Sequence, residues 1–278
     1  MPMTAYRRLW AFSLLVLSLA LARGLAVPQG VAEARPPLPT PRPYLDCRAV
    51  PQNAPSPRWQ ARVDAVARTY IAPDQPAAEA VARRLGFTRF PSPSNMCGPL
   101  SLAILRGAGL VPPQTPLSRF WLLNPRTDRH IIRTVLPPER FCHSRFDQPL
   151  NAVDFRSFPL QAGDLLYLYA GPGDTFEHIL VVSRVDAAGR VYAVTNLNLA
   201  AQGYYVIREV MLYDPQRPGE GQFYRWTDRQ YAATIGVTGR GGFELWRPLW
   251  AVFPQPSEPF AQASRFGPWW GWRGLAVR

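Results

Sequence analysis

A cysteine and a histidine in this chain have the surroundings that a thiol nucleophile and its base require. Cys97 follows a Pro- and Ser-rich stretch and begins a predicted helix, so the helix dipole favours the thiolate and lowers its pKa. His178 precedes the apolar run Ile-Leu-Val-Val, which predicts a central strand that fixes the histidine backbone. An imidazole beside a cysteine accepts the thiol proton and later protonates the leaving amine. The pair therefore predicts hydrolysis of an amide bond through a thioester.

A third polar residue is needed to hold the imidazole ring of His178 in the correct tautomer. The next predicted strand ends in Thr-Asn-Leu-Asn, across a tight hairpin from His178. We expect Asn196 to orient the ring. Thr195 and Asn198 stay open as alternatives, because the sequence alone does not fix the register of two strands. The expected catalytic set is therefore Cys97, His178 and Asn196.

The other two histidines predict no catalytic role. His130 falls in a predicted surface helix, and His143 directly follows Cys142 in a stretch where a histidine is usually solvated. Three widely separated histidines without a Cys-x-x-Cys motif do not meet the spacing that zinc sites need. The sequence also has no P-loop and no glycine-rich dinucleotide motif that opens a helix. We expect neither a metal nor an organic cofactor.

Three cysteines leave at least one thiol unpaired in a monomer. Cys47 lies in a proline-rich arm and Cys142 in a stretch predicted to be irregular, residues 139–146. We expect these two to form a disulfide that ties the arm to the core, which requires an oxidising compartment. Cys97 is then the free thiol, and the alternative interpretation is that it is only a core residue.

The N-terminal residues predict export. Two arginines precede an apolar run, residues 9–22, which has the length of a signal-peptide core and falls short of the roughly 20 residues of a spanning helix. We expect a secreted or cell-envelope protein with no membrane span after signal cleavage, and the alternative is an uncleaved anchor. The expected organisation is a signal peptide over 1–34, a Pro-rich linker or arm over 35–57, one domain over 58–254 and a Trp-rich tail over 255–278.

Composition and charge limit the classes of partner. The 278 residues carry a formal net charge of +12, and the 31 basic residues are all arginine. Because the arginines are spread along the chain without a block of like charges, we expect no nucleic acid partner. A charge of this sign can also attract the protein to anionic polymers of the cell surface. We expect a monomer.

Helical patterns occupy the first half of the domain and strand patterns the second. Helices are predicted over residues 59–70, 74–85 and 97–108, with Gly109 ending the third, and shorter ones near 117–123, 129–136 and 228–235. Strands are predicted over residues 165–169, 179–185, 191–195, 204–212, 222–226 and 243–246. Helices first and hairpin-linked strands later predict an α+β fold with an antiparallel sheet.

Two segments resemble papain-like hydrolases. NMCGPLSLAIL, residues 95–105, is similar to the nucleophile helix of C39-like peptidases, and EHILVV, residues 177–182, is similar to their histidine strand. GDLLY, residues 163–167, resembles the matching part of NlpC/P60 and CHAP amidases, which cleave cell walls. The resemblance covers roughly residues 90–200. It implies a papain-like fold in which Cys97 attacks the substrate, and Gly98 lets a substrate backbone approach closely.

The chain departs from the C39-like pattern at two points. Those enzymes carry a glutamine before the cysteine as part of the oxyanion hole, but no glutamine lies between Gln75 and Cys97, so we assign this role to Asn95 with the Cys97 amide. Asn196 is followed by Leu197 and not by proline. Two functions remain. One is a secreted thiol hydrolase that cleaves peptide or isopeptide bonds, with peptidoglycan as the expected substrate. The other is an inactive papain-like module that binds cell-wall material or a protein partner.

Overall fold

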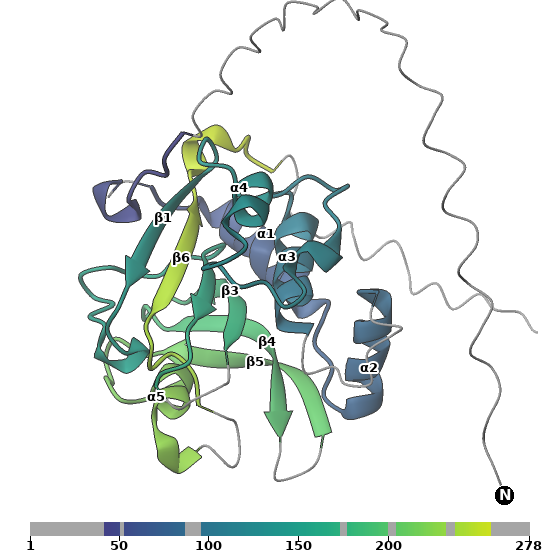
Figure 1. Cartoon of the computed structure of the whole chain (residues 1–278), viewed down its shortest axis with the longest axis vertical. Helices are drawn as coiled ribbons and strands as arrows, with labels where there is room; N and C mark the ends of the chain where they lie inside the picture. The colour runs from purple at the N-terminus through teal and green to yellow at the C-terminus, as the bar shows by residue number, and fades with distance from the viewer. Residues whose placement is uncertain are drawn as a thin grey trace, which may run out of the picture. The chain divides into compact units, whose positions relative to one another are not determined.

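The computed structural model describes residues 42–50, 53–86, 96–172, 177–199, 204–231 and 237–256. These residues form an α+β fold in which helices from the N-terminal half pack on a six-stranded antiparallel sheet, as the sequence predicted (Figure 1). The expected signal peptide lies outside the described residues, as do residues 35–41 of the arm and the tail from residue 257 on. Among the described residues, no helix is long and apolar enough to cross a membrane.

The sheet has the strand order β1-β6-β2-β3-β4-β5, and each neighbouring pair is antiparallel. Strands β2 to β5 follow one another along the chain, and β6 returns to lie between β1 and β2. Successive side chains of each strand point to opposite faces of the sheet. The strands are β1 (Phe141–Phe146), β2 (Leu165–Leu168), β3 (His178–Val185), β4 (Val191–Leu199), β5 (Tyr204–Tyr213) and β6 (Phe243–Pro248).

Side-chain caps explain where the first two helices begin. The Ser56 hydroxyl accepts a hydrogen bond from the Trp59 N–H at the start of α1, and the Asp74 carboxylate accepts from the Ala77 N–H at the start of α2. Both helices also carry a proline in the first turn, where its missing N–H is not needed. The α-helices are α1 (Pro57–Arg68), α2 (Gln75–Arg84), α3 (Cys97–Ala108), α4 (Arg129–Val135) and α5 (Gln222–Thr227).

Helix α3 presents Cys97 as its first residue. Gly109 ends the helix with a φ of 87°, a left-handed conformation that favours glycine. A Cβ at Gly98 would lie only 1.9 Å from the carbonyl oxygen of Phe120. Glycine at this position is therefore required by the packing of α3 against the 3-10 turn Leu117–Phe120, independently of any substrate.

Two apolar clusters cover the two faces of the sheet. On one face, which we call the α3 face, Ile179 and Val181 of β3 join buried side chains from α1, α2, α3 and α4. On the other, the α5 face, Leu180 and Val182 of β3 join Trp226 of α5. The alternation along β3 therefore decides which cluster each of its side chains enters.

Two segments differ from their predicted structure. Residues 222–226, predicted as a strand, form helix α5, because Phe223 and Trp226 are one helical turn apart and both enter the cluster on the α5 face. Residues 139–146, predicted to be irregular, contain β1, which pairs with β6 over its whole length. Short apolar runs fit a helix or a strand equally well, so only the packing partners distinguish them.

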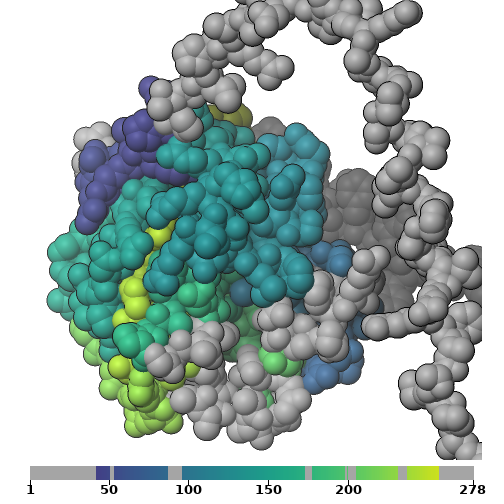
Figure 2. All heavy atoms as spheres, viewed as in Figure 1, coloured from purple at the N-terminus to yellow at the C-terminus, as the bar shows by residue number. Residues whose placement is uncertain are grey.

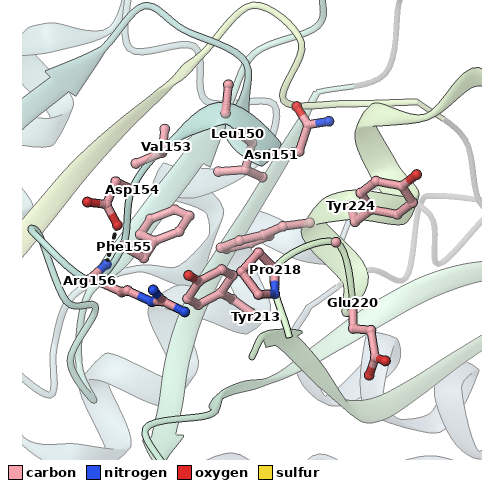
Figure 3. Close-up of a pocket in the computed structure, with 13 residues that line it drawn as sticks. Leu150, Asn151, Val153, Asp154, Phe155, Arg156, Tyr213, Pro218, Glu220 and Tyr224 are labelled. Carbon is pink, nitrogen blue, oxygen red and sulfur yellow. Dashed lines mark hydrogen bonds between the residues drawn. The ribbon is translucent and has the colours of Figure 1, made fainter. Parts of the chain in front are cut away.

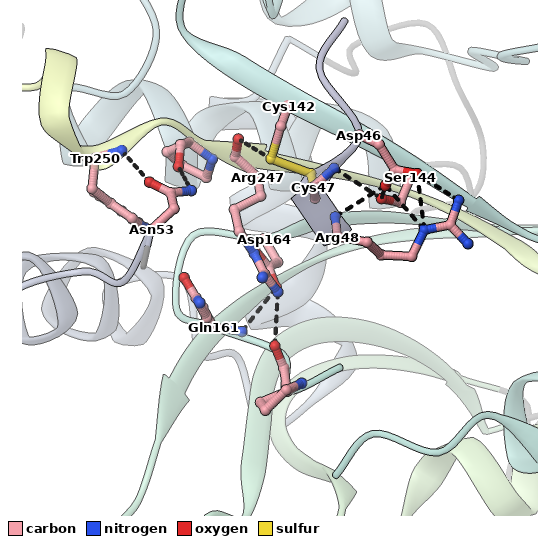
Figure 4. Close-up of a disulfide and its surroundings, with 12 residues drawn as sticks. Asp46, Cys47, Arg48, Asn53, Cys142, Ser144, Gln161, Asp164, Arg247 and Trp250 are labelled. Carbon is pink, nitrogen blue, oxygen red and sulfur yellow. Dashed lines mark hydrogen bonds and ion pairs between the residues drawn. A yellow bond between two sulfur atoms is a disulfide. The ribbon is translucent and has the colours of Figure 1, made fainter. Parts of the chain in front are cut away.

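The predicted disulfide ties the arm before α1 to the edge strand β1. Cys47 and Cys142 are bonded, with Cα atoms 5.0 Å apart (Figure 4). The arm also runs along β1, since the His143 N–H donates to the Leu45 carbonyl at 2.9 Å and the Ser144 hydroxyl donates to a carboxylate of the arm at 2.6 Å. The space-filling view shows the arm lying against this edge (Figure 2). The disulfide is consistent with an extracytoplasmic location.

A buried ion pair lies beside this disulfide (Figure 4). Arg247 of β6 donates from Nε and Nη2 to the two carboxylate oxygens of Asp164, at 2.8 and 2.7 Å, and both side chains are almost fully buried. Nη2 of the same arginine also donates to the Pro159 carbonyl. Asp164 belongs to the Gly-Asp segment that resembles the amidases, and in this structure it joins the start of β2 to β6.

Candidate functional site

Cys97 lies at the start of α3, half-buried, and packs against the cluster on the α3 face. It is the free cysteine, since the other two are bonded to each other. Burial raises the pKa of its thiol, and hydrogen bonding from backbone N–H groups, that of Ile179 first among them, offsets the effect only in part. This direction is opposite to the lowering that the sequence predicted, because apolar surroundings disfavour a thiolate.

His178 is the first residue of β3, and its ring lies on the α5 face. A hydrogen bond of 2.8 Å joins its Nε2 to the hydroxyl of Thr195, and its ring centroid is 5.1 Å from that of Trp226. The side chain is buried, and desolvation lowers its pKa to about 4. The imidazole is therefore neutral at pH 7 and held by a hydroxyl in an apolar setting.

Cys97 and His178 contact different apolar clusters of the sheet. The thiol enters the cluster on the α3 face, whereas the imidazole contacts Trp226 in the cluster on the α5 face. The group that meets the thiol is the backbone N–H of the next residue, Ile179. Because side chains alternate along a strand, a difference of one position moves a side chain to the other face. The sequence identified the strand but not the face.

Strands β3 and β4 separate where these residues lie. Their ladder covers residues 182–185 of β3. Before it, the hydrogen bond between His178 and Thr195 links the two strands on the α5 face, while the Cys97 thiol meets the Ile179 N–H on the other side. An N–H at that position would serve the ladder if the two strands stayed paired. The separation therefore makes a backbone donor available to the start of α3.

Thr195, one of the alternatives to Asn196, forms a hydrogen bond with His178. Asn196 is buried and pairs in register with Ile207, whose side chain belongs to the cluster on the α3 face, so it shares that face with Cys97. Asn198, the remaining alternative, lies in β4. Asn95, the expected oxyanion donor, lies outside the described residues, and the disulfide residues Cys47 and Cys142 are paired as predicted.

Tyr167 of β2 is the titratable side chain on which the Cys97 thiol acts electrostatically. The Tyr167 hydroxyl donates a hydrogen bond to the Glu177 carboxylate. Burial raises the pKa of Tyr167, and Glu177 and the nearby Cys97 thiol add to that effect. The ring of Tyr167 lies 5.0 Å from the ring of Tyr169, so polar groups continue along the α3 face away from Cys97.

These groups lead to a buried carboxylate, Glu244 of β6. The Tyr169 hydroxyl and the His143 Nε2–H each donate to it at 2.7 Å. Arg145 and Arg129 lie 3.7 and 3.9 Å from the same carboxylate. Burial acts to raise the pKa of Glu244, but the hydrogen bonds from His143 and Tyr169 and the charges of His143 and Arg129 lower it below its usual value. Glu244 is therefore an ionised carboxylate fixed by four donors or cations.

His143 is the functional candidate that the sequence analysis missed. Its placement in an irregular stretch was wrong, because β1 aligns it opposite Trp246 and beside Glu244. One signal could have found the pair. Glu244 interrupts the apolar run Phe-Glu-Leu-Trp, and a charge in a buried strand requires a partner. Among the described residues, no group of three His, Cys, Asp or Glu side chains could hold a metal ion.

A hollow of about 210 Å³ lies elsewhere, between residues 150–156, the end of β5 and the start of α5 (Figure 3). Its lining includes Asp154 and Glu220, and Tyr224 stands at its rim (Figure 3). Arg156, also in its lining, donates to the Pro215 carbonyl. The predicted catalytic set takes no part in this lining.

Comparisons with family models, with curated proteins and with solved structures give no match for this chain. Its functional interpretation therefore depends on the residues and their geometry.

Proposed function

We propose that this chain is an extracytoplasmic binding domain with a papain-like arrangement, which binds cell-wall material or a protein partner without hydrolysing it. The observation that carries the proposal is the position of the His178 ring, on the face of the sheet opposite to Cys97. A cysteine nucleophile needs a base within hydrogen-bond reach. The His178 ring contacts Trp226 and bonds to Thr195, both on the α5 face.

The protonation states of both residues support the same proposal. Burial raises the pKa of Cys97 and lowers that of His178, so both groups are neutral at pH 7. A thiol nucleophile paired with imidazolium would need the opposite shifts. These shifts favour the alternative interpretation of Cys97, in which it is a packing residue.

The location and charge of the protein fit a binding role. The disulfide between Cys47 and Cys142 is stable in an oxidising compartment, such as the cell envelope. The net charge of +12 attracts anionic polymers at a cell surface. Binding requires fixed complementary groups but no activated nucleophile, and the fixed polar groups on the α3 face meet that requirement.

The test is the alkylation rate of Cys97 by iodoacetamide at about pH 6, well below the pKa of a free thiol. We expect labelling slower than that of a model thiol in the same buffer, and no change in His178→Gln. Thr195→Val is the second variant, because it removes the hydrogen bond that holds the ring and adds no charge. His143→Gln is the matched control, since it changes a histidine far from Cys97 along the sheet order. Circular dichroism confirms that each variant is folded.

A thiol hydrolase remains the second candidate, because the single free thiol lies at the start of a helix and next to a backbone donor. Fast labelling of Cys97 that falls in His178→Gln, with cleavage of isolated peptidoglycan, would establish this candidate and overturn the binding proposal. Sedimentation of the protein with peptidoglycan without release of fragments supports binding.

A further inference from the structure

A small cavity lies between α4 and the strands β1 and β6, next to the arm that the disulfide fixes. Its volume is about 50 Å³, which is room for a small polar group or a few water molecules. Three ring-bearing side chains and two arginines form most of its lining, which comprises Tyr44, Pro125, Arg129, Ile132, Arg133, His143 and Trp246. It is separate from the hollow beside α5 and shares His143 and Arg129 with the groups around Glu244.

The rings of this cavity are fixed by their own contacts. The Tyr44 hydroxyl donates to the Leu136 carbonyl at 2.6 Å, and the Tyr44 ring lies 5.6 Å from the ring of His143. His143 in turn lies 4.9 Å from the ring of Trp246. Arg133 lies over the Tyr44 ring, 5.1 Å from its centroid, and donates to a carbonyl of the arm. The cavity is therefore preorganised, with little side-chain freedom to lose when a ligand binds.

The charges at the cavity favour an anion. Arg129 and Arg145 lie near one buried carboxylate, Glu244, and Arg145 is already paired with an exposed aspartate, while Arg133 adds a further positive charge to the lining. A second carboxylate, Glu139, also acts on Tyr44 electrostatically. Arg129 stays 3.9 Å from Glu244, beyond hydrogen-bond distance, and 59% of its side chain is exposed. Its guanidinium therefore retains donors in the planar geometry that binds a carboxylate at two points.

We propose that this cavity binds a carboxylate carried by a small polar ligand, with Arg129 as the group that contacts the carboxylate. Arg133 supplies a second positive charge, and the rings of Tyr44 and His143, inclined to each other by 51°, contact the part of the ligand next to the carboxylate. The inference rests on the proposed binding function. Two sources share this chemistry, an acidic sugar and the C-terminus of a peptide, and the experiment separates them.

The test is isothermal titration of the full chain with two matched pairs of small molecules. Glucuronate is compared with glucose, and N-acetyl-alanine with N-acetyl-alanine amide. We expect the carboxylated member of at least one pair to bind about tenfold or more tightly than its neutral partner, the factor expected for a charge-assisted hydrogen bond. Arg129→Gln should weaken that binding by a similar factor. Glucuronate alone would identify an acidic sugar, and N-acetyl-alanine alone a peptide terminus.

The control variant is Arg83→Gln, which removes an equally exposed arginine from α2 and leaves the cavity unchanged. Equal binding of the charged and neutral members, or equal weakening in Arg83→Gln and Arg129→Gln, would overturn the proposal. Equal competition by sulfate would overturn the assignment to a carboxylate. Alkylation of Cys97 tests the proposed function separately. If the chain binds carboxylates and also hydrolyses a substrate through Cys97, the proposed function fails and the carboxylate site stands.

Discussion

The regions around His143 and His178 place the same type of side chain in two different environments on one sheet. His143 donates to an ionised carboxylate, has arginines nearby and keeps part of its ring exposed. His178 bonds to the hydroxyl of Thr195 and is buried against Trp226. A counter-charge can balance a positive ring, whereas a hydroxyl in apolar surroundings cannot. The comparison indicates that the surroundings of a histidine, more than its place before an apolar run, decide what chemistry it can perform.

The largest effect is expected where a buried charge loses its counter-charge. Asp164→Leu leaves the Arg247 guanidinium buried and unbalanced, so we expect the free energy of unfolding to fall by about 3–5 kcal/mol. Denaturant unfolding measures this change. The double variant Asp164→Leu/Arg247→Met should recover most of the loss, because it removes both charges. Equal losses in the single and double variants would show that packing, and not charge balance, dominates buried sites in this protein.

The second prediction compares the region around His143, which lies next to the disulfide, with the region around His178, which does not. Replacing both Cys47 and Cys142 with serine should cost about 2–4 kcal/mol, because the bond closes a long loop in the unfolded chain. Amide exchange should rise first in β1, next to His143, and later in β3 around His178. Cys97→Ser, which leaves the disulfide intact, is the control. Equal exchange in both strands would show that the two regions open together.

The third prediction concerns pH and the buried imidazole of His178. Its pKa is about 4 in the folded chain and near 6.5 when unfolded, so the unfolded state binds a proton first as the pH falls. Stability from this group is present above pH 6.5 and is lost as the pH falls from 6.5 towards 4. Between pH 7 and pH 5 the loss should be about 2 kcal/mol in the wild type.

Denaturant unfolding of His178→Gln at the same two pH values is the comparison for this prediction. The variant should lack this part of the pH dependence, while His143→Gln should keep it. An unchanged pH dependence in His178→Gln would mean that the imidazole is not held neutral by burial.

The smallest effect is expected at the wall of the cavity beside His143. Tyr44→Phe removes the hydrogen bond to the Leu136 carbonyl and keeps the ring, so we expect a loss of about 1 kcal/mol. Burial raises the pKa of Tyr44 to about 12, so this loss should be the same at pH 5 and pH 8. Thermal unfolding at both pH values measures it. A loss that differs between them would show that the wall is coupled to a titrating group.

Much of the fold could be predicted because local patterns agreed with the final packing. Apolar residues at helical spacing located α1 and α2, and Gly109 marked the end of α3. The segments that failed are short. Residues 222–226 and 139–146 have no sequence pattern that distinguishes a helix from a strand. The first segment depends on packing at the α5 face, and the second depends on pairing with β6.

The candidate site was less predictable, because it depends on strand faces. The free thiol, the disulfide and the start of α3 were all predicted from the sequence. The orientation of His178 was not, because a single step along a strand exchanges the two faces. The pairing of His143 with Glu244 joins residues 101 positions apart, and only the register of β1 and β6 brings them together.

The disulfide joins the first and third cysteines of the chain and leaves out the second. If the chain is oxidised while it is exported with its N-terminus first, Cys47 can pair with Cys97 before Cys142 has been exported. Reaching the native bond from that early pairing requires thiol–disulfide exchange, in which the Cys142 thiolate attacks Cys47 and releases Cys97. Once α3 has folded, the buried Cys97 thiol rarely ionises, so it no longer attacks the finished bond. The burial of this one thiol thus makes oxidative maturation effectively one-way.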